Sequence, residues 1–353
     1  MFLSQTLKNG HNQTVTCIAC TQNNDNNANE FISGSELGEV CFWSATDGRL
    51  VKKLRLSVWE NDDIMCIKCS VKNPEQVFVS ASHKVIVYDL KYLDKPLQEL
   101  SFAEDEINEI SLNGEESHLA AAEDSGNIKV FDLRANKLMK TLRNHENICS
   151  GVSFRPNRAA ELLSCSFDQK LIHWEYLKSK SFCILNMQEV GAQPDDEENY
   201  LVNPPFIHSL SVNCSGSLVA CGTENALVQV FDGSKKILRH VKTLRKHHRG
   251  VAQVHSLLFA ENLLLSAGND NLLCLWELNN ISQNIDYSRT NGNHLTANHN
   301  SRNRSQSTNE RTPLWQMNHS ESFNWLSSGI SGNSKFLLVA DNSTEPLVFT
   351  YAE

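Results

Sequence analysis

The chain has 353 residues, of which 40% are hydrophobic and 21% are charged, and its net charge is −9. An acidic surface does not attract nucleic acid or anionic membranes, so we expect neither as a direct partner. The sequence has no apolar run of about 18 residues and no signal-like N-terminus, and its 11 cysteines are odd in number. These features predict a soluble protein of the cytosol or nucleus.

Short alternating runs of apolar residues recur along the chain, separated by Gly, Asn, Asp and Ser, as expected of β-strands. Seven of these runs end in an aromatic residue, and four of the six intervals between those aromatic residues measure 43 or 45 residues. A period of this length with several strands in each repeat predicts an all-β, seven-bladed propeller. The seven aromatic residues are Trp43, Tyr88, Phe131, Trp174, Phe231, Trp276 and Phe349.

The two long intervals contain polar segments that we interpret as insertions into intact repeats of one propeller, which spans residues 1–353. Residues 188–205 are acidic and follow the expected fourth strand of the fourth blade. Residues 279–311 are rich in Asn, Ser and Arg, and we predict that they are disordered. This second insertion precedes the expected fourth strand of the sixth blade. It should therefore lie on the same face of the propeller as Arg134, which follows the third strand of the third blade.

The best copy of the repeat runs from His145 to Trp174 and reads HENICSGVSF followed by LLSCSFDQKLIHW. It resembles the WD-repeat family, in which a His, a Ser, an Asp and a Trp form a buried hydrogen-bonded network in each blade. The resemblance assigns these roles to His145, Ser166, Asp168 and Trp174. Two other blades carry partial copies of the motif. The first blade has His11, Ser35 and Trp43, with Leu37 at the Asp position. The sixth blade has His247, Asp270 and Trp276, with Gly268 at the Ser position.

The two ends of the chain predict how the ring closes. Residues 2–7 form an expected strand before the first repeat, and residues 347–351 form the last strand. Propellers avoid an open sheet edge, so the N-terminal strand should complete the last blade.

Two Cys-x-x-Cys pairs, Cys17 with Cys20 and Cys66 with Cys69, are the strongest candidates for a metal site. Both pairs lie in expected first strands, where residues three apart point to opposite faces, so we expect no metal. The His and Asp residues recur with the repeat, whereas catalytic groups occur once. We therefore predict a protein that is not an enzyme and has no cofactor.

The sequence Phe131-Asp132-Leu133-Arg134 resembles the box with which cullin-4 substrate receptors dock on their ligase adaptor. The resemblance makes Asp132 and Arg134 docking candidates, with Asp89 and Lys91 at the matching place one repeat earlier. Several stretches also resemble the WD repeat-containing protein 53 family, which is thought to belong to these receptors. They are DEINEISLN (105–113), AAAEDSGNIKVFDL (120–133), HENICSGVSFRP (145–156) and the acidic insertion after NMQE (186–189).

We therefore expect a monomeric platform for binding proteins, acting as a substrate receptor of a cullin-4 ubiquitin ligase. Its partner would be the adaptor called damage-specific DNA-binding protein one. The alternative is a scaffold or peptide-reading propeller of a chromatin or ribosome-assembly complex. The acidic run of Asp195, Asp196, Glu197 and Glu198 is a candidate partner loop.

Overall fold

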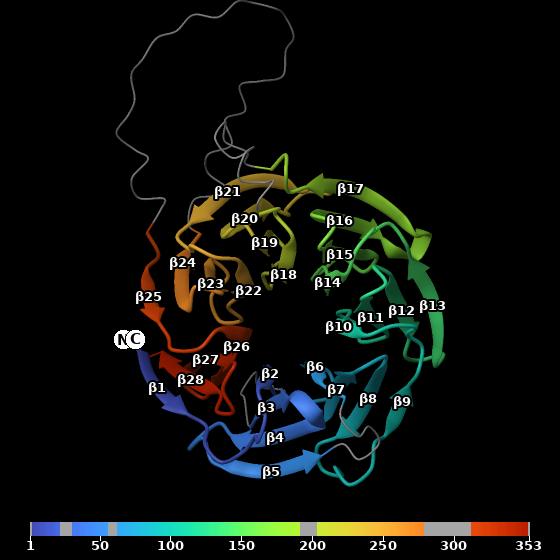
Figure 1. Cartoon of the computed structure of the whole chain (residues 1–353). Helices are drawn as coiled ribbons and strands as arrows, with labels where there is room; N and C mark the ends of the chain where they lie inside the picture. The colour runs from blue at the N-terminus through green and yellow to red at the C-terminus, as the bar shows by residue number, and fades with distance from the viewer. Residues whose placement is uncertain (1, 22–29, 56–61, 191–202, 279–311, 352–353) are drawn as a thin grey trace, which may run out of the picture.

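The computed structural model describes residues 2–21, 30–55, 62–190, 203–278 and 312–351. These residues form seven antiparallel sheets of four strands each, arranged as blades around a central axis (Figure 1). In every blade the first strand lies nearest the axis and the fourth lies at the rim. The prediction of a seven-bladed β-propeller is therefore confirmed.

The strands of the first four blades follow one another in chain order. The first blade contains β2 (Val15–Cys20), β3 (Glu30–Ser35), β4 (Glu39–Ser44) and β5 (Leu50–Arg55), with the 3-10 turn η1 (Glu36–Gly38). The second contains β6 (Ile64–Cys69), β7 (Gln76–Ala81), β8 (Lys84–Asp89) and β9 (Gln98–Leu100). The third contains β10 (Ile107–Leu112), β11 (His118–Glu123), β12 (Ile128–Asp132) and β13 (Lys137–Leu142). The fourth contains β14 (Cys149–Phe154), β15 (Glu161–Ser166), β16 (Lys170–Glu175), the 3-10 turn η2 (Tyr176–Lys178) and β17 (Lys180–Asn186).

The remaining three blades follow the same order until the ring closes. The fifth contains β18 (Ile207–Val212), β19 (Leu218–Thr223), β20 (Leu227–Asp232) and β21 (Arg239–Arg245). The sixth contains β22 (Val251–Ser256), β23 (Leu263–Gly268), β24 (Leu272–Glu277) and β25 (Trp315–Asn318). The seventh contains β26 (Phe323–Ser331), β27 (Ser334–Asp341), β28 (Leu347–Tyr351) and β1 (Phe2–Thr6).

Strand β1 closes the ring. It pairs antiparallel with β28, from Phe2 opposite Tyr351 to Thr6 opposite Leu347, so the first residues of the chain form the outer strand of the last blade. The two termini lie side by side in Figure 1. The pairing gives β28 a partner and removes a free sheet edge, as the sequence predicted.

The hydrophobic core lies between neighbouring blades. The second and third strands are buried nearly throughout because both of their faces contact another blade, whereas fourth strands such as β5 and β13 are partly exposed. One cluster joins Ile32 and Val40 of the first blade to Ile64 and Val79 of the second. Burying side chains of this size contributes about 1.5–3 kcal/mol each, so the stacking of blades holds the ring together.

The direction of the strands defines two faces. Turns between first and second strands, and between third and fourth strands, lie on one face, which we call the Arg134 face after a residue that follows β12. Turns between second and third strands, and the connections between blades, lie on the other, which we call the Asp168 face. The first strands run from the Asp168 face to the Arg134 face and line the central channel.

Candidate functional site

Four side chains of the fourth blade form a buried hydrogen-bonded network at the Asp168 face. The Nδ1 atom of His145 lies 3.0 Å and 3.1 Å from the two carboxylate oxygens of Asp168. A carboxylate only accepts, so Nδ1 carries the proton. The Nε2 atom of His145 lies 2.8 Å from the hydroxyl of Ser164, which accepts the Trp174 indole N–H at 2.8 Å. The network therefore connects β15, β16, the turn between them and the segment before the blade.

The Asp168 carboxylate also fixes the local backbone. It accepts the backbone amides of Glu146 and Lys170 at 3.1 Å and 3.0 Å. Burial by itself would raise the pKa of Asp168, but the bonds from His145 and from these amides outweigh burial and hold the pKa below its usual value. The carboxylate is therefore a structural anion.

The sixth blade contains the same complete network. The Nδ1 atom of His247 lies 3.1 Å from Asp270, and its Nε2 atom lies 2.8 Å from the Ser266 hydroxyl, which also accepts the Trp276 indole N–H at 2.8 Å. The expectation that Gly268 replaces the serine is wrong. A Cβ at Gly268 would lie 2.4 Å from an Asp270 oxygen, so glycine leaves room for the network.

The serine of the network lies two residues earlier than the sequence predicted. Ser164, not Ser166, joins His145 to Trp174, and in the first blade Ser33, not Ser35, joins His11 to Trp43 at 2.6 Å and 2.7 Å. Residues two apart on a strand share a face, so the sequence pattern cannot separate the two serines. The Ser166 hydroxyl instead donates to the Asn147 carbonyl and accepts the Asp168 backbone amide, and the Ser35 hydroxyl donates to the Glu36 carbonyl.

Other blades supply the carboxylate in different ways, which the sequence reading missed. In the first blade, Glu39 of β4 accepts the backbone amide of Asn12 at 2.8 Å and pairs with Lys53 at 2.7 Å. In the seventh, His319 lies 2.7 Å from Asp341. A carboxylate near the His position at the Asp168 face is therefore more general than the sequence motif indicates.

The docking candidates lie on the Arg134 face. The Asp132 carboxylate accepts the backbone amides of Arg134 and Ala135 at 2.9 Å and 2.8 Å, and Asp89 accepts the amide of Lys91 at 2.8 Å. The two aspartates thus hold the turns that follow β12 and β8. The bond from the Ala135 amide is the main reason why the pKa of Asp132 lies below its usual value.

The two basic candidates differ in their surroundings. The Lys91 ammonium pairs with Glu75 at 3.0 Å. The Arg134 side chain is exposed, and within the described residues its guanidinium forms no hydrogen bond or ion pair. The pKa of the Glu115 carboxyl is lowered mainly by Lys72, and the positive charge of Arg134 lowers it a little more. The guanidinium is therefore available to a partner, whereas the ammonium of Lys91 is occupied.

Large exposed apolar side chains concentrate on this same face. Tyr92 is 73% exposed and follows the turn held by Asp89, and Val71 is 58% exposed in the turn after β6. The backbone amide of Val71 donates to Glu116 of the third blade, so this turn reaches towards the blade that carries Arg134. Other exposed apolar residues of this face are Leu177, Ile237, Leu258 and Leu314. Of these residues, Tyr92 and Val71 belong to the second blade and Leu177 to the fourth, the two blades next to that of Arg134.

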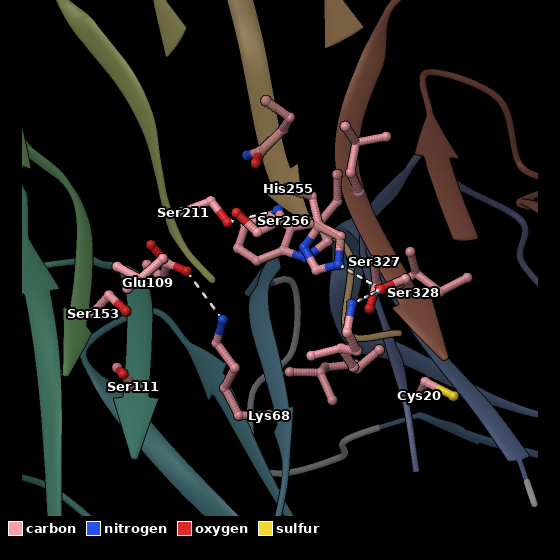
Figure 2. A pocket seen from close by; sticks show the side chains of 18 of the residues that line it. Cys20, Lys68, Glu109, Ser111, Ser153, Ser211, His255, Ser256, Ser327 and Ser328 are labelled. Carbon is pink, nitrogen blue, oxygen red and sulfur yellow. Dashed lines mark hydrogen bonds and ion pairs between the residues drawn. The ribbon is translucent and has the colours of Figure 1, made fainter. Parts of the chain in front are cut away.

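The inner part of the channel holds a cavity of about 310 Å³ with a polar lining (Figure 2). Lys68 of β6 points towards Glu109 of β10, and the two charged groups lie 3.0 Å apart. The Nε2 atom of His255 lies 2.9 Å from the Ser328 hydroxyl on the other side. The charged and polar groups satisfy one another, which fits a structural role for the inner channel.

A second cavity, of about 600 Å³, lies at the opening of the channel on the Asp168 face. Turns between second and third strands supply Glu36, Asp124 and Phe167, and the start of a first strand supplies His208. Gln253 and Trp325 line both cavities, so the second cavity lies directly above the first. We call the second cavity the channel mouth.

Cys17, Cys20 and Cys66 are buried, and Cys69 is partly buried. Burial raises the pKa of the Cys66 thiol to about 11. Among the described residues, no three side chains of His, Cys, Asp or Glu gather closely enough to hold a metal ion. No helix in the described part of the chain is long and apolar enough to cross a membrane.

The candidate partner loop of Asp195, Asp196, Glu197 and Glu198 lies outside the described residues, as do residues 279–311. The strands on either side of each insertion are described. Strands β17 and β18 belong to the fourth and fifth blades, and β24 pairs with β25 inside the sixth.

The chain is similar to several known proteins. A model of the family described as WD domain, G-beta repeat, matches residues 3–44 and 136–175. A WD repeat-containing protein 53 homolog from Dictyostelium discoideum is 28% identical over 95% of this chain and 91% of that protein. Histone acetyltransferase type B subunit 2 from Candida glabrata is 24% identical over 46% of this chain and 37% of its own length. Ribosome biogenesis protein ytm1 from Pyrenophora tritici-repentis is 28% identical over 42% and 29%.

The matched repeats, the seven four-stranded blades and the recurring His–Ser–Trp bonds agree with one another. The side chains of these bonds join the strands within each of these blades. The chain therefore folds as a seven-bladed β-propeller with WD repeats, and it resembles the WD repeat-containing protein 53 homolog over most of its length.

Proposed function

We propose that this propeller is a substrate receptor of a cullin-4 ubiquitin ligase. It would dock on the adaptor, damage-specific DNA-binding protein one, through the Arg134 face and leave the rest of its surface for the substrate. All chemistry would belong to its partners. The observation that carries the proposal is the exposed Arg134 guanidinium, held on a turn by Asp132 and without an ion pair in the described part of the chain.

The surroundings of Arg134 support docking at this place. A guanidinium presents a planar fork of donors that suits carboxylate and carbonyl groups, and it is always charged. Exposed Tyr92 and Val71 belong to the neighbouring blade on the same face and offer apolar contact. Aromatic and Arg side chains together dominate the binding energy of many protein interfaces.

The test is co-purification of the full chain with the adaptor. Arg134→Ala should weaken binding about 30-fold or more, which corresponds to a loss of roughly 2 kcal/mol. Lys91→Ala should weaken it less because Lys91 is already paired with Glu75. Arg143→Ala is the matched control, since Arg143 is exposed and follows β13 of the same blade on the other face. The proposal fails if the wild-type chain does not retain the adaptor, or if Arg134→Ala retains it equally well.

The second candidate function is a scaffold without a ligase partner. Two relatives that match part of this chain support the scaffold function. One is named as a histone acetyltransferase subunit and the other as a ribosome biogenesis protein. Both are less than 30% identical over less than half of this chain. Affinity purification followed by mass spectrometry separates the two functions. A chromatin or pre-ribosomal complex recovered without the adaptor would favour the scaffold.

A further inference from the structure

The acidic net charge of the chain hides one strongly basic segment. Residues 235–249 contain seven Lys or Arg residues and no Asp or Glu, so the segment carries a charge of +7. The whole chain carries −9, so the other residues together carry −16. The segment comprises the end of the turn after β20, the strand β21 and the connection to the sixth blade. We call its seven cations the basic strip: Lys235, Lys236, Arg239, Lys242, Arg245, Lys246 and Arg249.

The basic strip follows the rim of the fifth blade from one face of the ring to the other. Strand β21 is the fourth strand of its blade and runs from the Arg134 face to the Asp168 face (Figure 1). Its seven residues span about 23 Å, at about 3.3 Å per residue. A bulge in β21 places Arg239 opposite Asp232 and Lys242 opposite Val230, so the two cations point to the same side of the blade. The strip is therefore an extended line of positive charge.

Most cations of the strip are available to an external anion. The carboxylate of Asp232, which lies opposite Arg239 in the sheet, accepts the backbone amide of Ser234 at 2.9 Å. The Lys236 ammonium lies 4.0 Å from the centre of the Phe182 ring, in the neighbouring fourth blade. Five cations are exposed or partly exposed and form no ion pair within the described residues: Lys235, Arg239, Lys242, Lys246 and Arg249.

The outer strand of the third blade provides a comparison. Lys137 and Lys140 occupy the same register in β13 as Arg239 and Lys242 do in β21. The matching segment of the third blade, residues 133–147, has four Lys or Arg residues and one Glu, which gives a charge of +3. The fifth blade therefore carries an excess of charge that its position in the repeat does not require.

We propose that the basic strip binds the phosphate backbone of a nucleic acid. Phosphates recur at every nucleotide, so a backbone that follows β21 meets one cation after another, whatever its base sequence. Charges more than about 8 Å away are largely screened at physiological salt, so the local charge of the strip outweighs the acidic remainder of the chain. The strip lies in a different blade from Lys91 and Arg134, so this proposal does not depend on the proposed ligase function.

Two other anionic partners fit the strip less well. The core of a protein interface is apolar and poor in charged residues, and a membrane-bound surface inserts apolar side chains between the lipid headgroups. Within residues 235–249, which the structure describes completely, Ile237 at one end is the single large apolar side chain that is exposed. A line of charge without an apolar centre favours a phosphate backbone over an acidic protein or an anionic membrane.

The test is fluorescence anisotropy of the full chain with labelled duplexes of about 20 base pairs, which at about 3.4 Å per base pair are longer than the strip. One duplex is RNA and the other is DNA of the same sequence, so the two arms identify the source of the phosphates. We expect a dissociation constant of about 1–100 μM at physiological salt, and a slope of about −4 for the logarithm of the association constant against that of the salt concentration.

Two further probes exclude the other partners. Polyglutamate and vesicles containing phosphatidylserine should each bind about tenfold more weakly than the better duplex, because neither offers a regular line of phosphates. The proposal is overturned if neither duplex binds, or if polyglutamate or the vesicles bind as tightly as the duplexes.

A matched pair of double variants locates the site. Arg239→Gln with Lys242→Gln should weaken duplex binding about tenfold and make the salt slope shallower by about 2. Lys137→Gln with Lys140→Gln removes two cations at the same register of the third blade, and should change binding by less than about twofold. Equal losses in the two double variants, at unchanged melting temperatures, would show that the duplex does not lie on the strip.

Two more variants complete the test. Lys235→Gln and Arg249→Gln, added to the Arg239 and Lys242 changes, remove exposed cations at the two ends of the strip and should weaken binding further. Arg134→Ala should bind the duplex as the wild type does, so loss of adaptor docking and loss of nucleic-acid binding remain separate results. A quadruple variant that is folded and binds as wild type would also refute the site.

Discussion

The hydroxyl of Ser164 lies 2.8 Å from the Nε2 atom of His145. The same hydroxyl accepts the indole N–H of Trp174, so one buried oxygen serves two partners on different elements. Ser266 does the same between His247 and Trp276. Ser33 also does so in the first blade. The fourth and sixth blades in addition bond their histidine to an aspartate, so these two networks should respond alike to substitution.

Removing the carboxylate of either network should destabilise the fold strongly. Asp168→Ala and Asp270→Ala each leave a buried histidine N–H and backbone amides without an acceptor. The cost of losing one side of such charge-assisted bonds is about 2–3 kcal/mol of unfolding free energy. Urea titration followed by fluorescence measures it.

The control for this prediction is Asp132→Ala. Asp132 also accepts backbone amides, but it lies in an exposed turn, where water can replace the carboxylate. We expect a much smaller loss than at Asp168. Equal losses for Asp132 and Asp168 would contradict a buried network.

The blades could be predicted from sequence, but the details of the network could not. The spacing of Trp43, Trp174 and Trp276 reports the repeat directly, because each ends the third strand of a blade. A strand repeats every two residues, so Ser164 and Ser166 fit the pattern equally. The sequence did not indicate the role of the Glu39 carboxylate, because Glu39 lies at the start of a strand and the motif has its Asp in the turn before that strand.

No sequence motif indicated the channel mouth. Its lining comes from one or a few residues of each blade, which meet only when the ring closes. Glu36 and Asp124 lie 88 positions apart in the sequence and line one cavity. Neither belongs to a motif, so only the tertiary structure brings these two carboxylates together.

Stability should fall as the pH drops below about 6.5, the usual pKa of histidine in an unfolded chain. Burial lowers the pKa of His11 to about 4 and that of His255 to about 3. The unfolded chain then binds more protons than the folded chain between pH 6.5 and these values. The stabilisation is therefore complete above pH 6.5 and is lost as the pH falls towards 4, by up to about 1.4 kcal/mol per pH unit for each group.

Urea midpoints of the wild type and of His255→Gln at pH 7 and pH 5 check this expectation. Glutamine can still accept a hydrogen bond from Ser328 but does not titrate. The variant should lose less stability between the two pH values than the wild type does. An equal loss would mean that His255 is not the neutral buried group that its surroundings indicate.

Arg155 should be essential for the contact between the fourth and fifth blades. Its buried guanidinium donates to Glu161 at 3.0 Å and to the carbonyl oxygens of Gly216, at 2.8 Å, and Gly233. Arg155→Ala removes the donor of the two carbonyls and one donor of the Glu161 carboxylate, which keeps His173 and Arg158 as partners. The change should cost about 2–3 kcal/mol. Thermal unfolding provides the measurement. Arg158→Ala is the control and should cost less than about 1 kcal/mol, because Arg158 is partly exposed.

Closure of the ring should depend on the residues that follow β1. Leu7 is fully buried and packs in the cluster between the first and seventh blades. Leu7→Ala should lower the unfolding free energy by about 2–5 kcal/mol. Leu177→Ala, at a side chain that is 47% exposed, should change it by less than about 0.5 kcal/mol. If Leu7→Ala changes the unfolding free energy only slightly in chemical denaturation, the last blade is stable without the contacts of Leu7, which follows β1.

Arg134 and Lys91 offer the sharpest test of the proposed adaptor docking, because they occupy matching turns of adjacent blades and differ in chemistry. Arg134→Lys keeps the charge but loses the planar fork, so binding to the adaptor should fall nearly as far as in Arg134→Ala. Lys91→Arg should leave binding close to wild type, because the positive charge at position 91 is already paired with the Glu75 carboxylate. Surface plasmon resonance with immobilised adaptor measures both variants. If Arg134→Lys binds as tightly as wild type, charge alone is sufficient, and docking through the geometry of a guanidinium is refuted.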